Sequence, residues 1–511
     1  MNFPRNFRAV TGLKLELFAS FAGTGWAGMV QVLCIPAFIK LMGIESYGLV
    51  GFYLVLQAML QILDLGLSPT MNREMARYSV QPDKRGEARD LVRTLEIGYW
   101  LIGLLIGAGI LVISPWLAAH WIKPGAMPVR RVAQAIILMG GLALFQWPVS
   151  FYQGGLMGLR QQVVLNALKI IAATLSNVGA VLILWWVSPT IKAFLLWQVG
   201  ISIGLVLALA RSLWRSLPPS ETPARINLNL VRNVRTFAAG MTGIAITSLI
   251  LTQADRVFVS KVFNLKIFGY YSLAWSVAAC PLILSGCVFS VLFPRMSALV
   301  ATGDRNAISQ AYHRGSQLMA VLILPVSSVL ASFSFEVLRL WTRNSETAAN
   351  TSEILTVLMI GSALNALLYL PYMLQLAYGW TKLPFAAGVI SISLIVPLIF
   401  PLTKHFGPVG AASIWAIVNV LNLLIAVPIM HRRLLSHDVW GYFSDIGRPL
   451  LCTTAITTIA RFAFTKPESS LSTVAVLAGV WALSLLSAVI AAPQVRTALR
   501  EHLSKLIPSY A

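Results

Sequence analysis

Long apolar runs recur from one end of the chain to the other, and short polar segments separate them. At ~1.5 Å of rise per residue, a helix of about 20 residues crosses the ~30 Å hydrocarbon layer of a membrane. The short alternating segments that are typical of a membrane β-barrel are absent from the sequence. The pattern therefore predicts an all-α polytopic membrane protein.

The apolar runs predict about 14 transmembrane helices. A polar stretch rich in arginine and proline separates the first six from the next six, and two more follow. The expected spans are, approximately, 15–39, 44–68, 95–116, 131–157, 163–187, 191–212, 237–263, 267–293, 316–335, 352–376, 384–403, 408–430, 449–465 and 471–491.

This order divides the chain into four parts. We expect an N-terminal lobe at 1–212, a basic cytoplasmic linker at 213–236, a C-terminal lobe at 237–430, and two extra helices with a basic cytoplasmic tail at 431–511. Basic residues are more numerous in the loops on the side that holds the linker. By the positive-inside rule that side is cytoplasmic, and an even number of spans places both termini there.

The two groups of six spans carry a weak internal repeat. One displacement of the chain against itself places Lys40 on Lys261 and Gly48 on Gly269, at matching places in the two groups. Because each group has an even number of spans, both enter the membrane in the same direction. The sequence therefore predicts a parallel repeat of two six-helix lobes about a pseudo-twofold axis along the membrane normal.

Composition agrees with a membrane protein, since 57% of the 511 residues are hydrophobic and only 11% are charged. The net charge of +21 comes mainly from loops between apolar runs, so it indicates topology and not a nucleic-acid partner. The four cysteines lie in apolar spans without metal-ligand spacing, and no P-loop or HExxH motif is present. We expect no metal, no cofactor and no enzymatic activity.

Polar side chains follow helical spacing inside several spans and are candidates for the lining of a cavity. Residues at i, i+3, i+4 and i+7 share one face of a helix. The candidates for substrate binding on such faces are Gln57, Gln61, Gln146, Gln153 and Gln253. Single polar residues in membrane helices also serve simply as interhelical hydrogen-bond partners, and that interpretation stays open for each of them.

Charged residues within spans are stronger candidates for a functional role. A charge at the centre of a membrane helix costs ~2.5–3.5 kcal/mol, so it is expected to face water or a partner. Arg256 and Lys169 are candidates for binding an anionic substrate, although a structural pairing of Arg256 and snorkelling of Lys169 are the alternatives. Asp64 and Asp255 are candidates for carrying a coupling ion.

Three stretches resemble the bacterial polysaccharide flippases, the Wzx-type members of the MOP superfamily. They are Tyr47-Gly48 with the segment Asp64 to Arg77, Gln253-Ala-Asp-Arg256 with Lys261, and Glu336-Val-Leu-Arg-Leu-Trp341. The resemblance implies a flippase of the bacterial inner membrane. Such a protein moves undecaprenyl-pyrophosphate-linked oligosaccharide from the cytoplasmic to the periplasmic leaflet, by alternating access through a basic central cavity. Membrane lipids, a proton or sodium ion, and other polysaccharide-assembly proteins are the further partners that it implies.

Other functions stay open. A MATE-like drug or cation antiporter of the same superfamily would need carboxylates for its substrates, whereas the spans here hold at least as much basic as acidic charge. A glycan polymerase would be expected to carry a long periplasmic loop, and the longest one predicted, at about 336–351, is short. A non-transporting scaffold predicts that changes in the cavity leave glycan export unaffected.

Overall fold

The computed structural model describes residues 25–60, 64, 67–79, 81, 85–219, 223–227, 246–247, 249–435, 438–463 and 469–506. Within these ranges the regular secondary structure is helical, apart from one isolated bridge between Lys123 and Asn264; turns and irregular segments connect the helices. The first part of the expected first span, the candidate Gln61, and the linker segments 220–222 and 228–236 lie outside the described residues.

Ten helical stretches of the described chain are long and apolar enough to cross a membrane. In a hydrocarbon layer a helix satisfies its own backbone hydrogen bonds, which explains why apolar runs of this length fold as helices. The predicted all-α, multi-pass membrane fold is confirmed. The count of 14 spans and the parallel repeat stay predictions.

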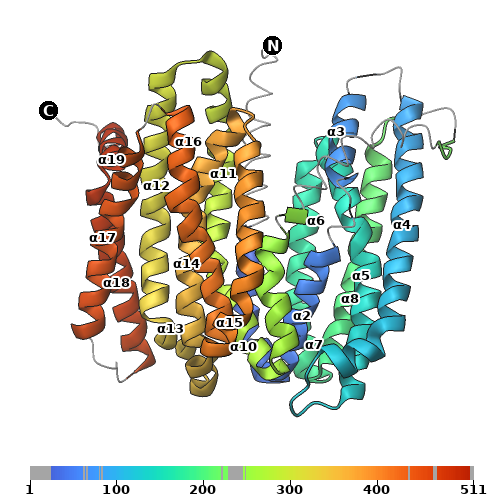
Figure 1. Ribbon diagram of the computed structural model, residues 1–511. Coiled ribbons are helices and arrows are strands. Elements are labelled where there is room, and N and C mark those ends of the chain that lie inside the picture. The colour runs from blue at the N-terminus through green and yellow to red at the C-terminus, as the bar shows by residue number, and fades with distance from the viewer. Residues whose placement is uncertain are drawn as a thin grey trace. The chain divides into compact units, whose positions relative to one another are not determined.

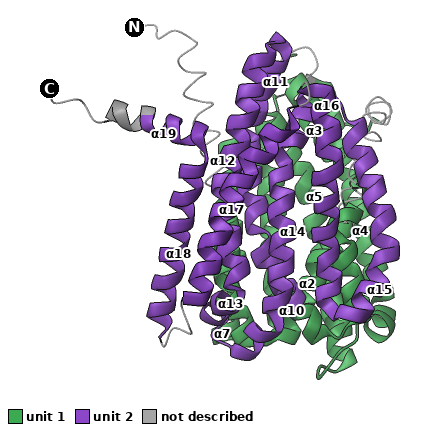
Figure 2. Cartoon of the chain, turned by 60° about the vertical axis from the view of Figure 1, so that its left-hand side comes forward, with its two compact units in different colours: residues 1–269 green, residues 270–511 purple. Residues whose placement is uncertain are grey.

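The chain divides into two compact units, Met1–Gly269 and Tyr270–Ala511 (Figure 2). In unit 1, residues 25–42 and 249–262 are helical, and α10 (Leu265–Ala278) begins near its end. The other helices of unit 1 are α2 (Ile44–Leu60), α3 (Leu67–Tyr78), α4 (Arg85–Trp116) with the π-helical turn η3 (Leu117–Trp121), α5 (Val129–Gly158), α6 (Gln162–Thr174) with η4 (Leu175–Gly179), α7 (Ala180–Trp186) and α8 (Ile191–Ser216) (Figure 1).

Helix α5 is central to the packing of unit 1, because α3, α4 and α8 all pack against it. Two glycines, Gly154 and Gly158, form its contact with α3. A Cβ atom on Gly154 would lie 2.5 Å from the carbonyl oxygen of Ser68, and one on Gly158 would lie 2.7 Å from the Cβ of Met75. Since glycine has no side chain, the two backbones approach closely, which places the start of α3 beside α5.

A reciprocal contact joins α2 to the start of α10. A Cβ atom on Gly48 would collide with the carbonyl oxygen of Leu265, and one on Gly269 would collide with that of Ile44. The sequence displacement that pairs Gly48 with Gly269 also pairs Ile44 with Leu265, so it exchanges the two contacts. The two glycines are therefore close-contact positions, and the repeat itself stays a prediction.

The helix at 249–262 is held at its carboxyl end by the segment that follows α4. Lys123 Nζ donates to the carbonyl oxygen of Val262 (3.0 Å), and Lys261 Nζ donates to that of His120 (2.6 Å). Trp121 Nε1 donates to Ser260 Oγ (3.2 Å). Lysine beside the last carbonyls of a helix satisfies acceptors that have no partner within the helix. The position of this helix within unit 1 is therefore set by several polar contacts.

The described part of the linker lies along α4. The backbone N–H of Arg225 donates to Asp90 Oδ1 (2.7 Å), and that of Asn227 donates to Thr94 Oγ1 (2.9 Å). Asp90 and Thr94 are four residues apart, so they share one face of α4. Two successive turns of the helix thereby offer acceptors to alternate residues of the linker.

Unit 2 is a helical bundle that contains most of α10 and all later helices. They are α11 (Cys280–Thr302), α12 (Arg305–Ser332), α13 (Ser334–Thr342), α14 (Ser345–Ala377), α15 (Lys382–Leu421), the π-helical turn η5 (Asn422–Ala426), α16 (Val427–Leu434), α17 (Val439–Ala463), α18 (Ser470–Ala491) and α19 (Pro493–Leu506). Helix α19 corresponds to the predicted basic tail.

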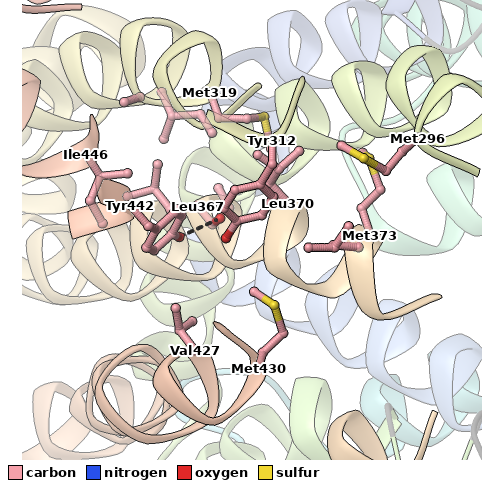
Figure 3. Packing of buried hydrophobic residues seen from close by; sticks show 14 of the residues in the cluster. Met296, Tyr312, Met319, Leu367, Leu370, Met373, Val427, Met430, Tyr442 and Ile446 are labelled. Atoms are coloured by element: carbon pink, nitrogen blue, oxygen red, sulfur yellow. Dashed lines mark hydrogen bonds between the residues drawn. The ribbon is translucent and has the colours of Figure 1, made fainter. Parts of the chain in front are cut away.

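The core of unit 2 joins α11, α12, α14, α16 and α17 through methionine, leucine and tyrosine side chains (Figure 3). Tyr312 and Tyr442 are fully buried there, with ring centroids 5.8 Å apart. The hydroxyl of Tyr442 donates to the carbonyl oxygen of Leu367 (3.2 Å). This bond provides a partner for the polar end of the buried Tyr442 side chain.

Helix α15 is interrupted at Gly407, whose backbone takes φ 59° and ψ −144°. These angles lie outside the helical region and are accessible chiefly to glycine. The interruption falls between the predicted spans 384–403 and 408–430. Helix α15 therefore consists of two helical segments that meet at Gly407.

A polar cluster ties α17, together with the residue before it, and α19 to α12. His313 Nδ1 lies 2.5 Å from Asp445 Oδ2, and His313 Nε2 lies 2.7 Å from Asp438 Oδ2. Gln317, one turn further along α12, donates to Asp445 Oδ1 (2.6 Å) and accepts from the backbone N–H of Gln494 (2.9 Å). An imidazole donates from both nitrogens only when doubly protonated, so this geometry is that of an imidazolium between two carboxylates.

Candidate functional site

A cavity of about 550 Å³ lies within unit 1. Its walls come from α2, the start of α3, α5 and the helix at 249–262. The described lining residues are Tyr53, Gln57, Ala58, Leu60, Asp64, Ser68, Ala143, Gln146, Trp147, Ser150, Leu249, Thr252 and Gln253. This volume is in the ~300–1,000 Å³ range of small-molecule sites.

Helix α5 contributes one stripe to the cavity. Ala143, Gln146, Trp147 and Ser150 all line it, and they stand at i, i+3, i+4 and i+7. This spacing puts the four side chains on one face of the helix. Gln146 and Ser150 are the polar groups that α5 contributes to the lining.

The side chain of Gln146 connects three helices. Its Oε1 accepts from the hydroxyl of Tyr53 (2.5 Å) and from Gln57 Nε2 (2.6 Å), both on α2. Its Nε2 donates to Ser202 Oγ on α8 (3.2 Å). A carboxamide has donors at one end and acceptors at the other, so a single glutamine can hold both neighbours in place.

Asp64 is the second hydrogen-bonding centre. Its Oδ1 accepts from Ser68 Oγ (2.6 Å) and from the hydroxyl of Tyr99 on α4 (2.5 Å), and Ser150 Oγ lies 3.4 Å away. Its Oδ2 accepts from the backbone N–H of Ser68 (3.1 Å). An ionised carboxylate accepts hydrogen bonds only, and here donors from three helices surround it. Hydrogen bonds to these helices therefore hold the carboxylate of Asp64 in place.

The lining is polar but carries little charge. Among the described lining residues Asp64 is the one charged group, and none is a lysine or arginine. The basic central cavity implied by the resemblance is thus not this cavity. The amides and hydroxyls present both donate and accept hydrogen bonds, so the walls are suited to a ligand rich in such groups.

The adjacent charges of the helix at 249–262 lie outside this lining. Gln253 and Thr252 line the cavity, and Arg256 follows them by one turn on the same helix. Asp255 is buried, and Arg256 is partly buried. The structure thus brings Gln57, Gln146, Gln253 and Asp64 together at one cavity and places the Asp255–Arg256 pair next to it.

The remaining candidates lie elsewhere. Lys169 is partly buried on α6, and Gln153 is partly buried on α5, one turn beyond Ser150. Neither is among the described lining residues of the cavity. In the part of the chain that the structure describes, no group of histidine, cysteine or acidic residues could hold a metal ion.

Several residues of the site were not identified from the sequence. Tyr53 precedes Gln57 by one turn, and Ser68 follows Asp64 by the same spacing, so helical periodicity could have found both. Trp147 stands in an apolar run, where no pattern in the sequence distinguishes it from residues of the core. Tyr99 comes from a helix with no other candidate, and the sequence gives no signal of its contact with Asp64.

Comparison with known proteins identifies the family. Residues 16–300, more than half of the chain, match the family described as polysaccharide biosynthesis protein. A Shigella flexneri protein named as an O-antigen transporter is 22% identical over 75% of this chain and 89% of its own length. The succinoglycan biosynthesis transport protein ExoT of Rhizobium meliloti is 25% identical over 59% of this chain and 57% of its own.

The fold also matches solved membrane transporters. The lipid II flippase MurJ in an inward closed conformation superposes with a TM-score of 0.70 at 15% identity, over 93% of this chain and 98% of that one. An inward-facing MATE multidrug transporter of the MOP superfamily gives 0.63 at 13% identity, over 80% and 95%. At these identities the likeness concerns the fold alone. The family match extends over more than half the sequence, and on that basis the chain belongs to the polysaccharide biosynthesis protein family.

Proposed function

We propose that the protein is a flippase for lipid-linked oligosaccharide repeat units in cell-surface polysaccharide biosynthesis. The substrate is undecaprenyl-pyrophosphate-linked saccharide, moved from the cytoplasmic to the periplasmic leaflet of the bacterial inner membrane. The family and the names of its relatives support this function. The observation that carries it is the hydrogen-bonding cavity set among membrane-spanning helices.

The physical problem of flipping requires such a cavity. Sugar hydroxyls and phosphates lose their hydration in ~30 Å of hydrocarbon, so they need a polar path through the protein. A site that opens to one side of the membrane at a time supplies this path without a continuous pore. We therefore propose transport by alternating access, with no chemical change to the substrate.

We propose a division of labour among the candidate residues. Arg256 and Lys169 attract the pyrophosphate or acidic sugars of the substrate. The glutamines proposed to bind the substrate are Gln57, Gln61, Gln146, Gln153 and Gln253. Asp64 or Asp255 carries a coupling proton or sodium ion. Residues 1–212 and 237–430 form the two moving lobes, joined by the linker at 213–236. Helices after 430 are an addition to this machinery, and both termini are cytoplasmic.

A MATE-like cation antiporter is the second candidate, because the fold is shared and one carboxylate lines the cavity. An organic cation would need an anionic group with open acceptor positions. The donors already bound to Asp64 leave few of these, which favours the saccharide.

Deletion of the gene in its native organism tests the function. We expect lipid-linked repeat units to accumulate in the cytoplasmic leaflet and surface polysaccharide to be lost, with both effects reversed by the wild-type gene. The Arg256→Ala variant is expected to restore export poorly, whereas Arg343→Ala, at the end of α13, is expected to restore it fully. Normal surface polysaccharide in the deletion strain would exclude the proposed function.

A further inference from the structure

The unit 1 cavity has a chemistry that distinguishes between the two parts of the proposed substrate. A lipid-linked saccharide presents a dianionic pyrophosphate and, directly attached to it, uncharged rings with hydroxyl groups. The cavity offers carboxamides and hydroxyls but, in its described lining, no cation. We propose, resting on the flippase function above, that this cavity binds a sugar ring of the repeat unit and that the pyrophosphate binds outside it.

Hydrogen bonding supports a polyhydroxyl ligand. A hydroxyl donates one hydrogen bond and accepts two, and a carboxamide side chain does both as well. Gln57, Thr252 and Gln253 present such groups from two sides of the cavity. Gln57 is held by Gln146 through one of its two N–H groups, so the second can point to a ligand.

Charge argues against the pyrophosphate in the same place. Asp64 would face it across the cavity, and the two negatively charged groups would repel each other. Arg256, by contrast, stands one helical turn beyond Thr252 and Gln253, and a turn rises only ~5.4 Å. The link between the first sugar and the pyrophosphate is short enough for the cavity to hold one while Arg256 attracts the other.

The walls also suit the carbon skeleton of a sugar. Trp147, Leu60 and Leu249 line the cavity beside the polar groups. The C–H groups of a pyranose ring form apolar patches, and the faces of aromatic rings carry negative charge density that attracts them. The mixture of amides, hydroxyls and one tryptophan therefore matches a sugar on both its polar and its apolar surfaces.

The test compares two lipids on full-length protein in nanodiscs. One is undecaprenyl pyrophosphate, and the other is the lipid-linked saccharide extracted from the deletion strain. We expect the wild type to bind the saccharide-bearing lipid at least about tenfold more tightly. Thr252→Val and Gln57→Leu should each reduce that affinity about fivefold, as loss of one hydrogen bond predicts, without changing the affinity for undecaprenyl pyrophosphate.

Arg256→Ala provides the contrasting variant, since it should lower the affinity for both lipids by the same factor. Thr252 is exposed, and valine has its shape, so this variant keeps the fold. Equal wild-type affinity for the two lipids overturns the saccharide site but leaves the flippase function standing. Loss of both affinities in Thr252→Val, or competition by the organic cation tetraphenylphosphonium, also overturns it. If the deletion strain traps no repeat units and the wild type does not bind undecaprenyl pyrophosphate, the flippase function itself is wrong.

Discussion

Replacement of Asp64 by asparagine is the sharpest perturbation of the cavity. Asparagine keeps the shape of the side chain but replaces one carboxylate oxygen by an NH₂ group. If the remaining oxygen takes the place of Oδ1, it retains the hydroxyls of Ser68 and Tyr99. The NH₂ group then faces the backbone N–H of Ser68, where Oδ2 accepts a hydrogen bond at 3.1 Å. The flipped orientation restores that bond and loses the hydroxyls instead.

The cost follows from the number of donors involved. A hydrogen bond to a charged group contributes ~1.5–3 kcal/mol, against about 1 kcal/mol for a neutral one. Loss of the bond from Ser68, together with weaker bonds from the two hydroxyls, should lower the free energy of unfolding by about 2–3 kcal/mol. For a unit of this size the midpoint of thermal unfolding should fall by about 4–5 °C.

Thermal unfolding of the purified full-length protein measures this effect. Glu353→Gln is the matched control, because Glu353 is exposed on α14 and the same chemical change should leave the midpoint unaltered. An Asp64→Asn protein as stable as the wild type would refute the hydrogen-bonded arrangement. The coupling role is tested separately by export under an imposed proton or sodium gradient. Export that still follows both gradients normally removes Asp64 from that role.

Two further predictions concern packing and the C-terminal helices. Gly48→Ala should destabilise the protein by about 1–3 kcal/mol, because the new methyl group would collide with backbone atoms, and Gly269→Ala should destabilise it by a similar amount. Gly98→Ala on α4 is the control. It has open space around it and should be neutral or stabilising. Equal stability of the Gly48 and Gly98 variants would contradict the close contact. His313→Leu leaves Asp438 and Asp445 without the imidazole between them, so we expect a loss of about 2–4 kcal/mol and faster proteolysis near Gln494. A protease-resistant C-terminus in this variant would show that the cluster does not hold α19.

Hydropathy predicted the fold well because a backbone in the hydrocarbon layer of a membrane has to form its hydrogen bonds within its own segment. Apolar runs of sufficient length had to become helices, and most expected spans lie within observed ones. The break at Gly407 was also placed correctly, between two predicted spans. The short helix α13 was not expected, since nine residues give too little periodicity to identify it.

Only part of the site could be predicted from the sequence. The cavity-facing sides of α2 and α5 could be predicted because Gln57 and Gln146 are polar residues within apolar runs. Their mutual hydrogen bond joins residues far apart in the chain, and no local pattern encodes such a pairing. The same holds for Tyr99 and Asp64. Arg256 was predicted to be functional because it is a charge in a membrane helix, but periodicity alone does not determine whether it lines the cavity or lies beside it.

The way in which the linker lies on α4 has a consequence for its evolution. The hydrogen bonds that hold it come from the backbone N–H groups of Arg225 and Asn227, whereas Asp90 and Thr94 contribute side chains. Substitutions in the linker therefore keep the attachment, unless they introduce proline, which has no N–H. Related chains are free to change the character of this segment while retaining its path, and selection at the attachment falls on α4.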